Sequence, residues 1–183
     1  MRVIDLGAAP GSWSQVSSNI VVPKITEKVG KVIAVDILPI EPIKNVDIIN
    51  GDFANKLVFE QICSLIETNS IDGNKKVDVI LSDMAPNLSG IWAIDIHKAM
   101  NLFYIALYLV KRLLKPNGSF LVKLFHGDGF EEYLTMLRQY FAKVIIFKPK
   151  SSRVESREVY AFANNFLTGS SSNGKILKGH FNE

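Results

Sequence analysis

The first apolar run of this chain contains an acidic residue and is followed by two glycines. Asp5 lies in that run and is followed by Gly7 and, after a turn of small residues, by Gly11. Glycines let a ligand approach the backbone because no Cβ blocks it. A strand, a glycine turn and a helix in this order are typical of a nucleotide-like cofactor site at the edge of a parallel sheet. The stretch Val3–Trp13 is therefore a candidate binding site.

Further aspartates, Asp36, Asp52 and Asp83, follow later strand-like runs. The carboxyl ends of parallel strands meet at one edge of a sheet, so we expect these carboxylates to converge on one crevice. Asp36 ends the second strand, where a ribose diol would bind. An ordinary strand-to-helix turn is the alternative explanation for Gly7 and Gly11.

The glycine spacing limits which cofactor can bind. Gly7 and Gly11 do not form G-x-G-x-x-G, and no G-x-x-x-x-G-K-[ST] occurs, so a phosphate-cradling P-loop is excluded. The wide turn suits a bulky ligand without a pyrophosphate. Together with Asp36 and the turn Gly51-Asp52-Phe53, it indicates S-adenosylmethionine.

Three residues have the chemistry for group transfer. Asp83 follows the apolar strand Val77–Leu81, Lys123 lies inside the otherwise apolar run Phe120–Phe125, and Glu158 begins the last strand. A buried lysine is costly unless it is paired or functional. Methyl transfer to a hydroxyl needs a donor, alignment and loss of a proton, and Lys123 would accept that proton or steer the oxygen lone pair.

Structural explanations remain open for each of these residues. Lys123 is also compatible with an edge-strand lysine that reaches water, and Asp83 with a turn cap. For Glu158, a salt bridge to Arg153 or Arg157 is the alternative to a catalytic role.

The length of the chain favours a single domain, and one segment of it is rich in positive charge. The 183 residues carry a net charge of +3, one cysteine and three histidines. The segment from Lys143 to Arg157 holds five cations and one acid, which suits a polyanion such as RNA, although a solvated basic edge gives the same pattern. A lone cysteine forms no internal disulfide, which indicates a reducing compartment. With one cysteine and three scattered histidines, no metal cluster is expected.

No apolar run approaches the roughly 18 residues of a membrane helix, and we expect no membrane partner. No exposed apolar stripe is evident, so a monomer is expected. The compartment stays open between the cytoplasm and an organelle such as the mitochondrion, because a targeting segment would precede Met1.

Strands alternate with helices, which predicts an α/β fold with a seven-stranded, mostly parallel sheet and an antiparallel last strand. The expected strands are Arg2–Leu6, Lys31–Asp36, Val46–Ile49, Val77–Ser82, Ser119–Phe125, Val144–Lys148 and Glu158–Asn164. The expected helices run from Ser12 to Pro23 or Val29, and over Asn55–Thr68, Ile96–Leu114 and Phe130–Phe141, with a polar loop at Asn69–Lys75. Residues 1–166 form the predicted domain, and 167–183 read as a disordered tail.

These residues resemble the FtsJ/RrmJ family of ribosomal RNA ribose methyltransferases, from Val3 to about Ala163. The motifs are Asp5-Leu-Gly-Ala-Ala-Pro-Gly-Ser-Trp-Ser-Gln15, Asp36-Ile-Leu-Pro39, Gly51-Asp52-Phe53, Ser82-Asp-Met-Ala-Pro-Asn-Leu-Ser-Gly90 and Lys148-Pro-Lys-Ser-Ser-Arg-Val-Glu-Ser-Arg-Glu-Val-Tyr160. The resemblance implies a Rossmann-like class I fold that uses S-adenosylmethionine. The implied substrate is the 2′-hydroxyl of RNA ribose, in a uridine of large-subunit ribosomal RNA.

The resemblance also implies roles for residues. The implied cofactor contacts are Gly7, Gly11, Trp13, Asp36, Asp52 and Asp83. Lys123 is the implied proton acceptor, with Asp83 and Glu158 beside it. The family uses a Lys-Asp-Lys-Glu tetrad whose first lysine precedes the glycine strand, and this chain does not contain it. We therefore expect this form to bind cofactor but to methylate poorly, which normal turnover on a ribosomal substrate would refute.

Several other functions share parts of this pattern. An amino-group base methyltransferase usually carries Asp/Asn-Pro-Pro-aromatic where this chain has Asp83-Met-Ala-Pro86, and a cytosine C5 enzyme needs a cysteine that Cys63 does not supply. A small-molecule methyltransferase leaves the basic segment unexplained, and the glycine spacing disfavours an NAD-dependent dehydrogenase. A methyltransferase for tRNA or another RNA, and a catalytically weak RNA- or ribosome-binding module, remain alternatives.

Overall fold

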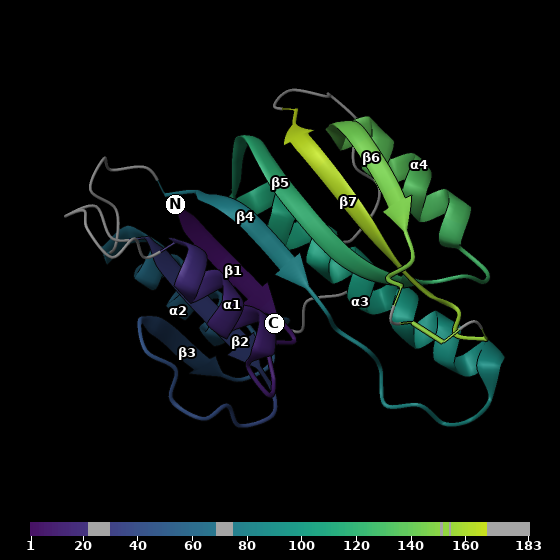
Figure 1. The fold of residues 1–183 in the computed structure, drawn as a ribbon, viewed down its shortest axis with the longest axis horizontal. Coiled ribbons are helices and arrows are strands. Elements are labelled where there is room, and N and C mark those ends of the chain that lie inside the picture. Colours follow the sequence, from purple (N-terminus) through teal and green to yellow (C-terminus); the bar gives the residue numbers. More distant parts are fainter. Residues whose placement is uncertain (22–29, 69–74, 151, 154, 168–183) are drawn as a thin grey trace.

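The computed structural model describes residues 1–21, 30–68, 75–150, 152–153 and 155–167, which alternate between strands and helices (Figure 1). The elements are β1 (Arg2–Leu6), α1 (Ser12–Val21), β2 (Lys31–Asp36), β3 (Val46–Asn50), α2 (Lys56–Thr68), β4 (Val77–Ser82), α3 (Trp92–Leu113), β5 (Leu114–Phe125), α4 (Phe130–Tyr140), β6 (Phe141–Phe147) and β7 (Glu158–Phe166).

The strands form one seven-stranded sheet in the order β3-β2-β1-β4-β5-β7-β6. The pairs from β3 to β5 are parallel, whereas β7 runs antiparallel to both β5 and β6. The predicted fold class is confirmed. Central β1 and β2 are buried almost throughout, as near-continuous apolar strands between two helical layers should be. The order reverses between β1 and β4, which is where α/β sheets bind ligands.

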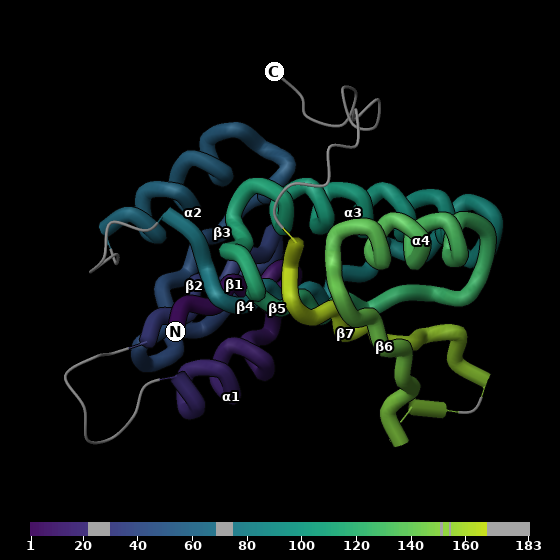
Figure 2. The backbone as a smooth tube through the Cα atoms, turned by 90° about the horizontal axis from the view of Figure 1, so that it is seen from above, coloured from purple at the N-terminus to yellow at the C-terminus, as the bar shows by residue number. Residues whose placement is uncertain are grey.

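The helices cover the two faces of the sheet unequally. Helix α1 lies on one face, and α2, α3 and α4 lie on the other (Figure 2). Successive side chains of a strand point to opposite faces, so the side chains of β5 and β7 point alternately toward the α3 and α4 layer and toward the other face. Val122 and the paired Ala161 point to the α3 and α4 side and are fully buried. On the other face, Leu121, Phe162 and Ile145 sit opposite one another across three strands, and Ile145 is 41% exposed.

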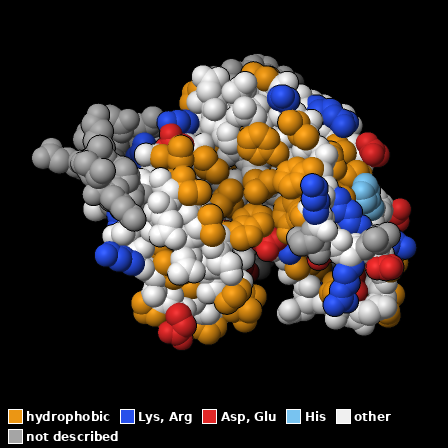
Figure 3. All heavy atoms as spheres, in the orientation of Figure 1, with side chains coloured by type: hydrophobic (Ala, Val, Ile, Leu, Met, Phe, Trp, Pro, Cys, Tyr) orange, Lys and Arg blue, Asp and Glu red, His pale blue; other side chains and the backbone are white. Residues whose placement is uncertain are grey.

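That second face corrects one expectation from the sequence. Apolar side chains gather on it in the middle of the view, over the strands to the right of β1 (Figure 3). Exposed Phe147 and Ile145 of β6 belong to this face. This apolar face is not evident from the sequence, because it is formed by every second residue of strands that lie apart in the chain. The expectation of no exposed apolar stripe is therefore wrong, and the monomer that it supported stays a prediction.

Most predicted boundaries agree with the structure to within a few residues. Helix α3 begins at Trp92 rather than Ile96, and β5 begins at Leu114, ahead of the predicted Ser119. A register shift between Val77 and Val79 accommodates the added residues of β5. The far end of the predicted first helix, most of the predicted loop Asn69–Lys75 and residues 168–183 of the predicted tail lie outside the described residues.

Among the described residues, α3 has the length and composition of a membrane span. More than half of its apolar window is buried within the fold, and its buried side chains include Phe103 and Leu107. It packs as a core helix against β5.

Candidate active site

The glycine turn after β1 brings the backbone close to the neighbouring strand ends. Gly7 has a φ of +71°, and a Cβ there would lie 2.7 Å from Met84 Cγ and 3.0 Å from Met84 Cα. Gly11 has a φ of +114° and faces Ile43. Both positions therefore need glycine, the first for the approach of two strand ends and the second for packing of the turn.

Asp36 is fixed at the end of β2 by two backbone groups. Ala9 N donates to Asp36 Oδ2 at 2.8 Å, and Leu38 N donates to Asp36 Oδ1 at 2.8 Å. Each carboxylate oxygen has a second lone pair for a ligand. Asp36 thus links the glycine turn to the end of the next strand.

Two adjoining cavities open at this edge of the sheet. The larger, of about 360 Å³, is lined by Gly7, Ala9, Asp36, Ile37, Leu38, Asp52, Phe53, Asp83, Met84, Ala85, Asn87 and Leu102. The smaller, of about 160 Å³, is lined by Asp5, Gly7, Ala8, Ala9, Pro10, Ser12, Trp13 and Asp83. The two share Gly7, Ala9 and Asp83, so they form one continuous site, which we call the cofactor cavity.

The structure brings the predicted cofactor residues together, with one exception. Gly7, Asp36, Asp52 and Asp83 line the larger part and Trp13 the smaller part. Gly11 is absent from both sets of described lining residues.

Asp5 stands at the base of the cofactor cavity. It is 1% exposed, and Ser14 Oγ donates to Asp5 Oδ2 at 2.6 Å. The other oxygen, Oδ1, has no hydrogen-bond partner among the described residues. Burial, with a smaller contribution from the Asp83 and Asp36 charges, raises the pKa of Asp5 to about 6 against the opposing Ser14 hydrogen bond. A buried acceptor without a donor is suited to a cationic or hydrogen-bonding ligand group.

Lys123 and Asp83 form a close pair beside the cavity. Lys123 Nζ lies 3.1 Å from Asp83 Oδ1 and donates to the Asp83 carbonyl oxygen at 2.8 Å. Lys123 is only 8% exposed, so this pairing compensates the burial of its charge. Asp83 N in turn donates to Leu6 O at 3.1 Å, which anchors the pair to β1. The predicted meeting of these two residues is observed, and neither alternative role, a solvent-reaching lysine or a simple turn cap, describes them.

Tyr160 completes this cluster and was not predicted from the sequence. It sits opposite Lys123 across β5 and β7, and its hydroxyl donates to Asp83 Oδ1 at 3.1 Å. Burial, followed by the charge and hydrogen bond of Asp83, raises the pKa of Tyr160 well above its ordinary value, so the hydroxyl stays a donor. Its ring lies between those of Trp13, at 5.7 Å, and Phe147, at 5.9 Å. The available signal was its place two residues after Glu158 on one strand.

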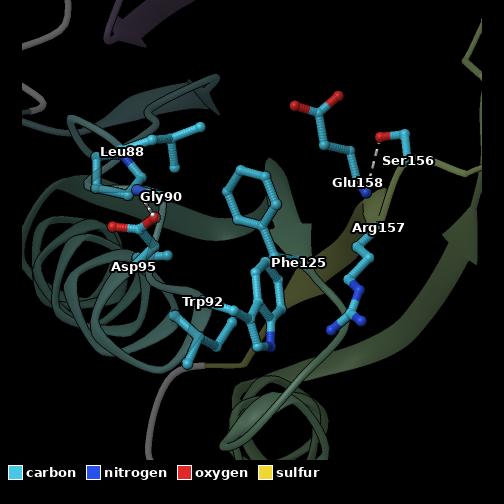
Figure 4. Close-up of a pocket in the computed structure, with 11 residues that line it drawn as sticks. Leu88, Gly90, Trp92, Asp95, Phe125, Ser156, Arg157 and Glu158 are labelled. Carbon is cyan, nitrogen blue, oxygen red and sulfur yellow. Dashed lines mark hydrogen bonds between the residues drawn. The ribbon is translucent and has the colours of Figure 1, made fainter.

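Glu158 lies at the start of β7, near this cluster. Its charge contributes to the raised pKa of Tyr160. Within the described residues, the structure brings its carboxylate into hydrogen-bonding contact with neither Lys123 nor Asp83. The alternative ion pair to Arg153 or Arg157 does not form among the described residues either. Its carboxylate instead faces a second hollow (Figure 4).

Comparisons with known proteins identify the relatives of this chain. The chain is 47% identical to the ribosomal RNA large subunit methyltransferase E of Marinobacter nauticus over 164 residues, 90% of this chain and 74% of that protein. It superposes on the crystal structure of a ribosomal RNA methyltransferase from Plasmodium falciparum with a TM-score of 0.75, at 28% identity, covering 91% of this chain and 86% of the other.

A more distant likeness extends only to the fold. The fibrillarin of Aeropyrum pernix, whose crystal structure contains natively bound S-adenosyl-L-methionine, gives a TM-score of 0.56 at 16% identity, over 88% of this chain and 65% of the other. The model of the FtsJ-like methyltransferase family matches residues 1–166, so the resemblance seen in the sequence is confirmed and the chain belongs to the FtsJ-like methyltransferase family.

Proposed function

We propose that this protein transfers the methyl group of S-adenosylmethionine to the 2′-hydroxyl of an RNA ribose, in a uridine of large-subunit ribosomal RNA. The pairing of buried Lys123 with Asp83 at the edge of the cofactor cavity carries the proposal. The names of the related enzymes support the RNA class. We further propose residues 1–166, the range matched by the family model, as the methyltransferase domain.

The cofactor cavity fits the chemical groups of S-adenosylmethionine. The orphaned Oδ1 of buried Asp5, with Asp83 nearby, suits a cationic amino group. The first N–H groups of α1, at Ser12 and Trp13, suit a carboxylate. Asp36 and Asp52 provide acceptors for the hydroxyl and amino groups of a nucleoside. When bound, S-adenosylmethionine supplies an electrophilic methyl group on a positively charged sulfur.

The protein's own residues would prepare the acceptor. Lys123 Nζ, in its neutral form, would take the proton of the 2′-hydroxyl as that oxygen receives the methyl group and the bond from the methyl carbon to the cofactor sulfur breaks, which leaves a neutral thioether. Asp83 and Tyr160 hold the lysine in place. Glu158, at the mouth of the second hollow, adds a negative charge on the acceptor side. Positioning by these groups contributes to the rate together with the proton transfer.

The surface around the site suits a polyanion. Five exposed cations lie on β6 and on the segment that joins it to β7: Lys143, Lys148, Lys150, Arg153 and Arg157. Positive side chains gather at the right of the molecule, on the side of the second hollow (Figure 3). Such a cluster neutralises phosphates and would give salt-dependent RNA binding.

The decisive experiment is transfer of labelled methyl to undermethylated large-subunit particles, followed by nucleoside analysis. We expect 2′-O-methyluridine. A label on a base would overturn ribose specificity, transfer to tRNA alone would overturn the ribosomal assignment, and cofactor binding with no transfer to any RNA would identify a silent module. Transfer to an RNA with a 2′-deoxy target nucleotide serves as the control and should be absent.

Cofactor identity has an independent test. S-adenosylmethionine should raise the melting temperature with a dependence on its concentration, by about 2.7 kcal/mol of stabilisation at a hundred times its Kd. NAD at the same concentration is the control, and an equal shift with NAD would contradict the assignment. The monomeric state and the lack of a membrane partner remain predictions, which sedimentation and vesicle binding would test.

A further inference from the structure

A second hollow, of about 350 Å³, adjoins the site on the far side of the segment that follows β4. Along that segment, Met84, Ala85 and Asn87 face the cofactor cavity, whereas Pro86, Leu88 and Gly90 face the second hollow. Its other walls include Trp92, Asp95, Phe125, Arg157 and Glu158. We call it the lateral groove. One short segment thus forms the wall between two binding spaces.

Two aromatic rings, those of Trp92 and Phe125, line the lateral groove. Phe125 projects between a side formed by Leu88 and a side formed by Arg157 and Glu158, with Trp92 next to it (Figure 4). The Arg157 guanidinium carbon lies 4.4 Å from the centroid of the Trp92 ring. Leu88 is 72% exposed and Trp92 40%, although both are large apolar residues. Their exposure is costly for a surface with no ligand.

The sides of the groove are fixed in place. Asp95 accepts hydrogen bonds from Ser89 N and Ser89 Oγ, both at 2.7 Å, and from Gly90 N at 3.1 Å. These hydrogen bonds lower the pKa of Asp95, so it stays ionised and keeps holding the loop. On the other side, His126 N donates to Arg157 O at 2.9 Å. A preformed groove loses less entropy when it binds a ligand.

The lateral groove is linked to the proposed catalytic residues. Phe125 lies two residues after Lys123 on β5, and its Cα pairs with that of Glu158 across the strands. A molecule in the groove would therefore touch Glu158 while its neighbouring atoms reach toward Lys123. A planar, uncharged group with a phosphate attached matches these surroundings, because most of the lining is apolar or aromatic and Arg157 adds a positive charge, while the Asp95 carboxylate is occupied by hydrogen bonds from Ser89 and Gly90.

We propose that the lateral groove binds a nucleobase of the RNA substrate, stacked on the Trp92–Arg157 pair beside the ribose that is methylated. Single-stranded RNA is commonly held by bases stacked on aromatic rings and on arginine guanidinium planes, at about 1–3 kcal/mol per base. The inference rests on the proposed function in that it takes the ligand to be RNA.

The test compares binding of a short oligouridylate with that of an abasic ribose-phosphate oligomer of equal length. We expect the protein to prefer the oligouridylate by about 5- to 150-fold, the equivalent of one stacked base. Trp92→Ala should abolish that preference and leave abasic binding unchanged. Arg157→Lys keeps the positive charge but removes the planar guanidinium, so it should reduce the preference for the oligouridylate. Lys150→Gln is the matched control on the same basic surface and should weaken both oligomers equally.

Equal affinity of the unaltered protein for the two oligomers would overturn the inference, as would a full preference retained in Trp92→Ala. Trp92→Phe keeps a ring against Gly127 and should restore most of the preference, which separates stacking from loss of folding. Failure of the proposed function looks different. Base-dependent binding without any methyl transfer would refute the proposed methyltransferase function but support nucleobase binding in the groove. Methyl transfer with an unchanged KM in Trp92→Ala would refute nucleobase binding in the groove but support the methyltransferase function.

Discussion

Lys123 of β5 is paired with Tyr160 of β7 across antiparallel strands, and both side chains contact the same oxygen, Asp83 Oδ1. Lys123 Nζ and the Tyr160 hydroxyl oxygen each lie 3.1 Å from it. The carboxylate therefore has a charged partner from β5 and a neutral donor from β7. This arrangement fixes the lysine from two directions, through the shared carboxylate oxygen and through the Asp83 carbonyl.

Substitution of Lys123 should separate proton transfer from simple orientation. Lys123→Ala should lower kcat by about 10²- to 10⁴-fold, the usual contribution of a general base. Lys123→Arg keeps a donor for Asp83 but cannot be deprotonated, so it should be equally inactive. Methyl transfer under saturating cofactor measures the effect. Lys56→Ala, at the exposed start of α2, should retain full activity. Substantial activity in Lys123→Arg would show that the amine only orients the acceptor.

Tyr160 is a positioning residue, and its hydroxyl can be removed without its ring. Tyr160→Phe keeps the contacts with Trp13 and Phe147 but loses the hydrogen bond to Asp83, worth about 0.5–1.5 kcal/mol. We expect kcat to fall by roughly 2- to 13-fold, with the cofactor Kd and the melting temperature unchanged. A change in KM with an unaltered kcat would contradict this role. Tyr160→Ala should in addition lower the melting temperature.

Much of the fold follows from local sequence, but the boundaries that depend on tertiary contacts do not. Apolar runs ending in Asp5 and Asp36 mark β1 and β2 correctly because both strands are buried on both faces. The sequence predicts that α3 begins at Ile96, four residues after its observed start at Trp92, because exposed apolar residues such as Ile91 and Ile94 break the amphipathic pattern. The turn before α3 is held by hydrogen bonds from Ser89 and Gly90 to the Asp95 carboxylate, and these contacts leave no periodic pattern in the sequence.

The site was likewise predictable in part. Asp83 and Lys123 stood out because one ends a strand and the other is a charge inside an apolar strand. Tyr160 did not, since its role depends on the register of β5 against β7, which the sequence does not display. The lateral groove joins Leu88, Phe125 and Arg157 from three separate segments, so only the assembled fold reveals it.

A Cβ at Gly7 should be more harmful than one at Gly90. Both residues have a positive φ, +71° and +82°, but only Gly7 faces the Met84 backbone, whereas Gly90 has open space. Gly90→Ala should cost about 1–2 kcal/mol of backbone strain. Gly7→Ala adds overpacking of about 1–3 kcal/mol and should weaken cofactor binding. Urea unfolding of both variants gives the comparison, and equal losses of stability would exclude the close approach of the two strand ends.

Asp5 should make stability depend on pH. Its folded pKa is raised from 3.8 to about 6, so the folded state holds the proton more tightly than the unfolded state. Stability is therefore greatest below about pH 4 with respect to this group and falls as the pH rises to about 6, by up to about 3 kcal/mol.

Asp5→Asn should remove that pH dependence and leave the protein more stable at neutral pH. Unfolding free energies measured near pH 4 and near neutrality, each relative to the unaltered protein, test this. Asp128→Asn, at an exposed position, is the control and should show little difference across the range. A variant less stable than the original at neutral pH would mean that the Asp5 carboxylate has a stabilising partner.

Because of the position of β7 in the sheet, the site can form only after this late segment of the chain has been synthesised. Among the described strands β7 comes last in the chain, yet it lies between β5 and β6, so the sheet stays divided until residues 158–166 leave the ribosome. Until then the inner edges of β5 and β6 are unpaired, and such edges are prone to aggregation. The same strand delivers Tyr160 to Asp83 and Glu158 to the lateral groove. Closure of the sheet and assembly of the site are therefore a single event, and a nascent chain that stops before β7 has an incomplete site.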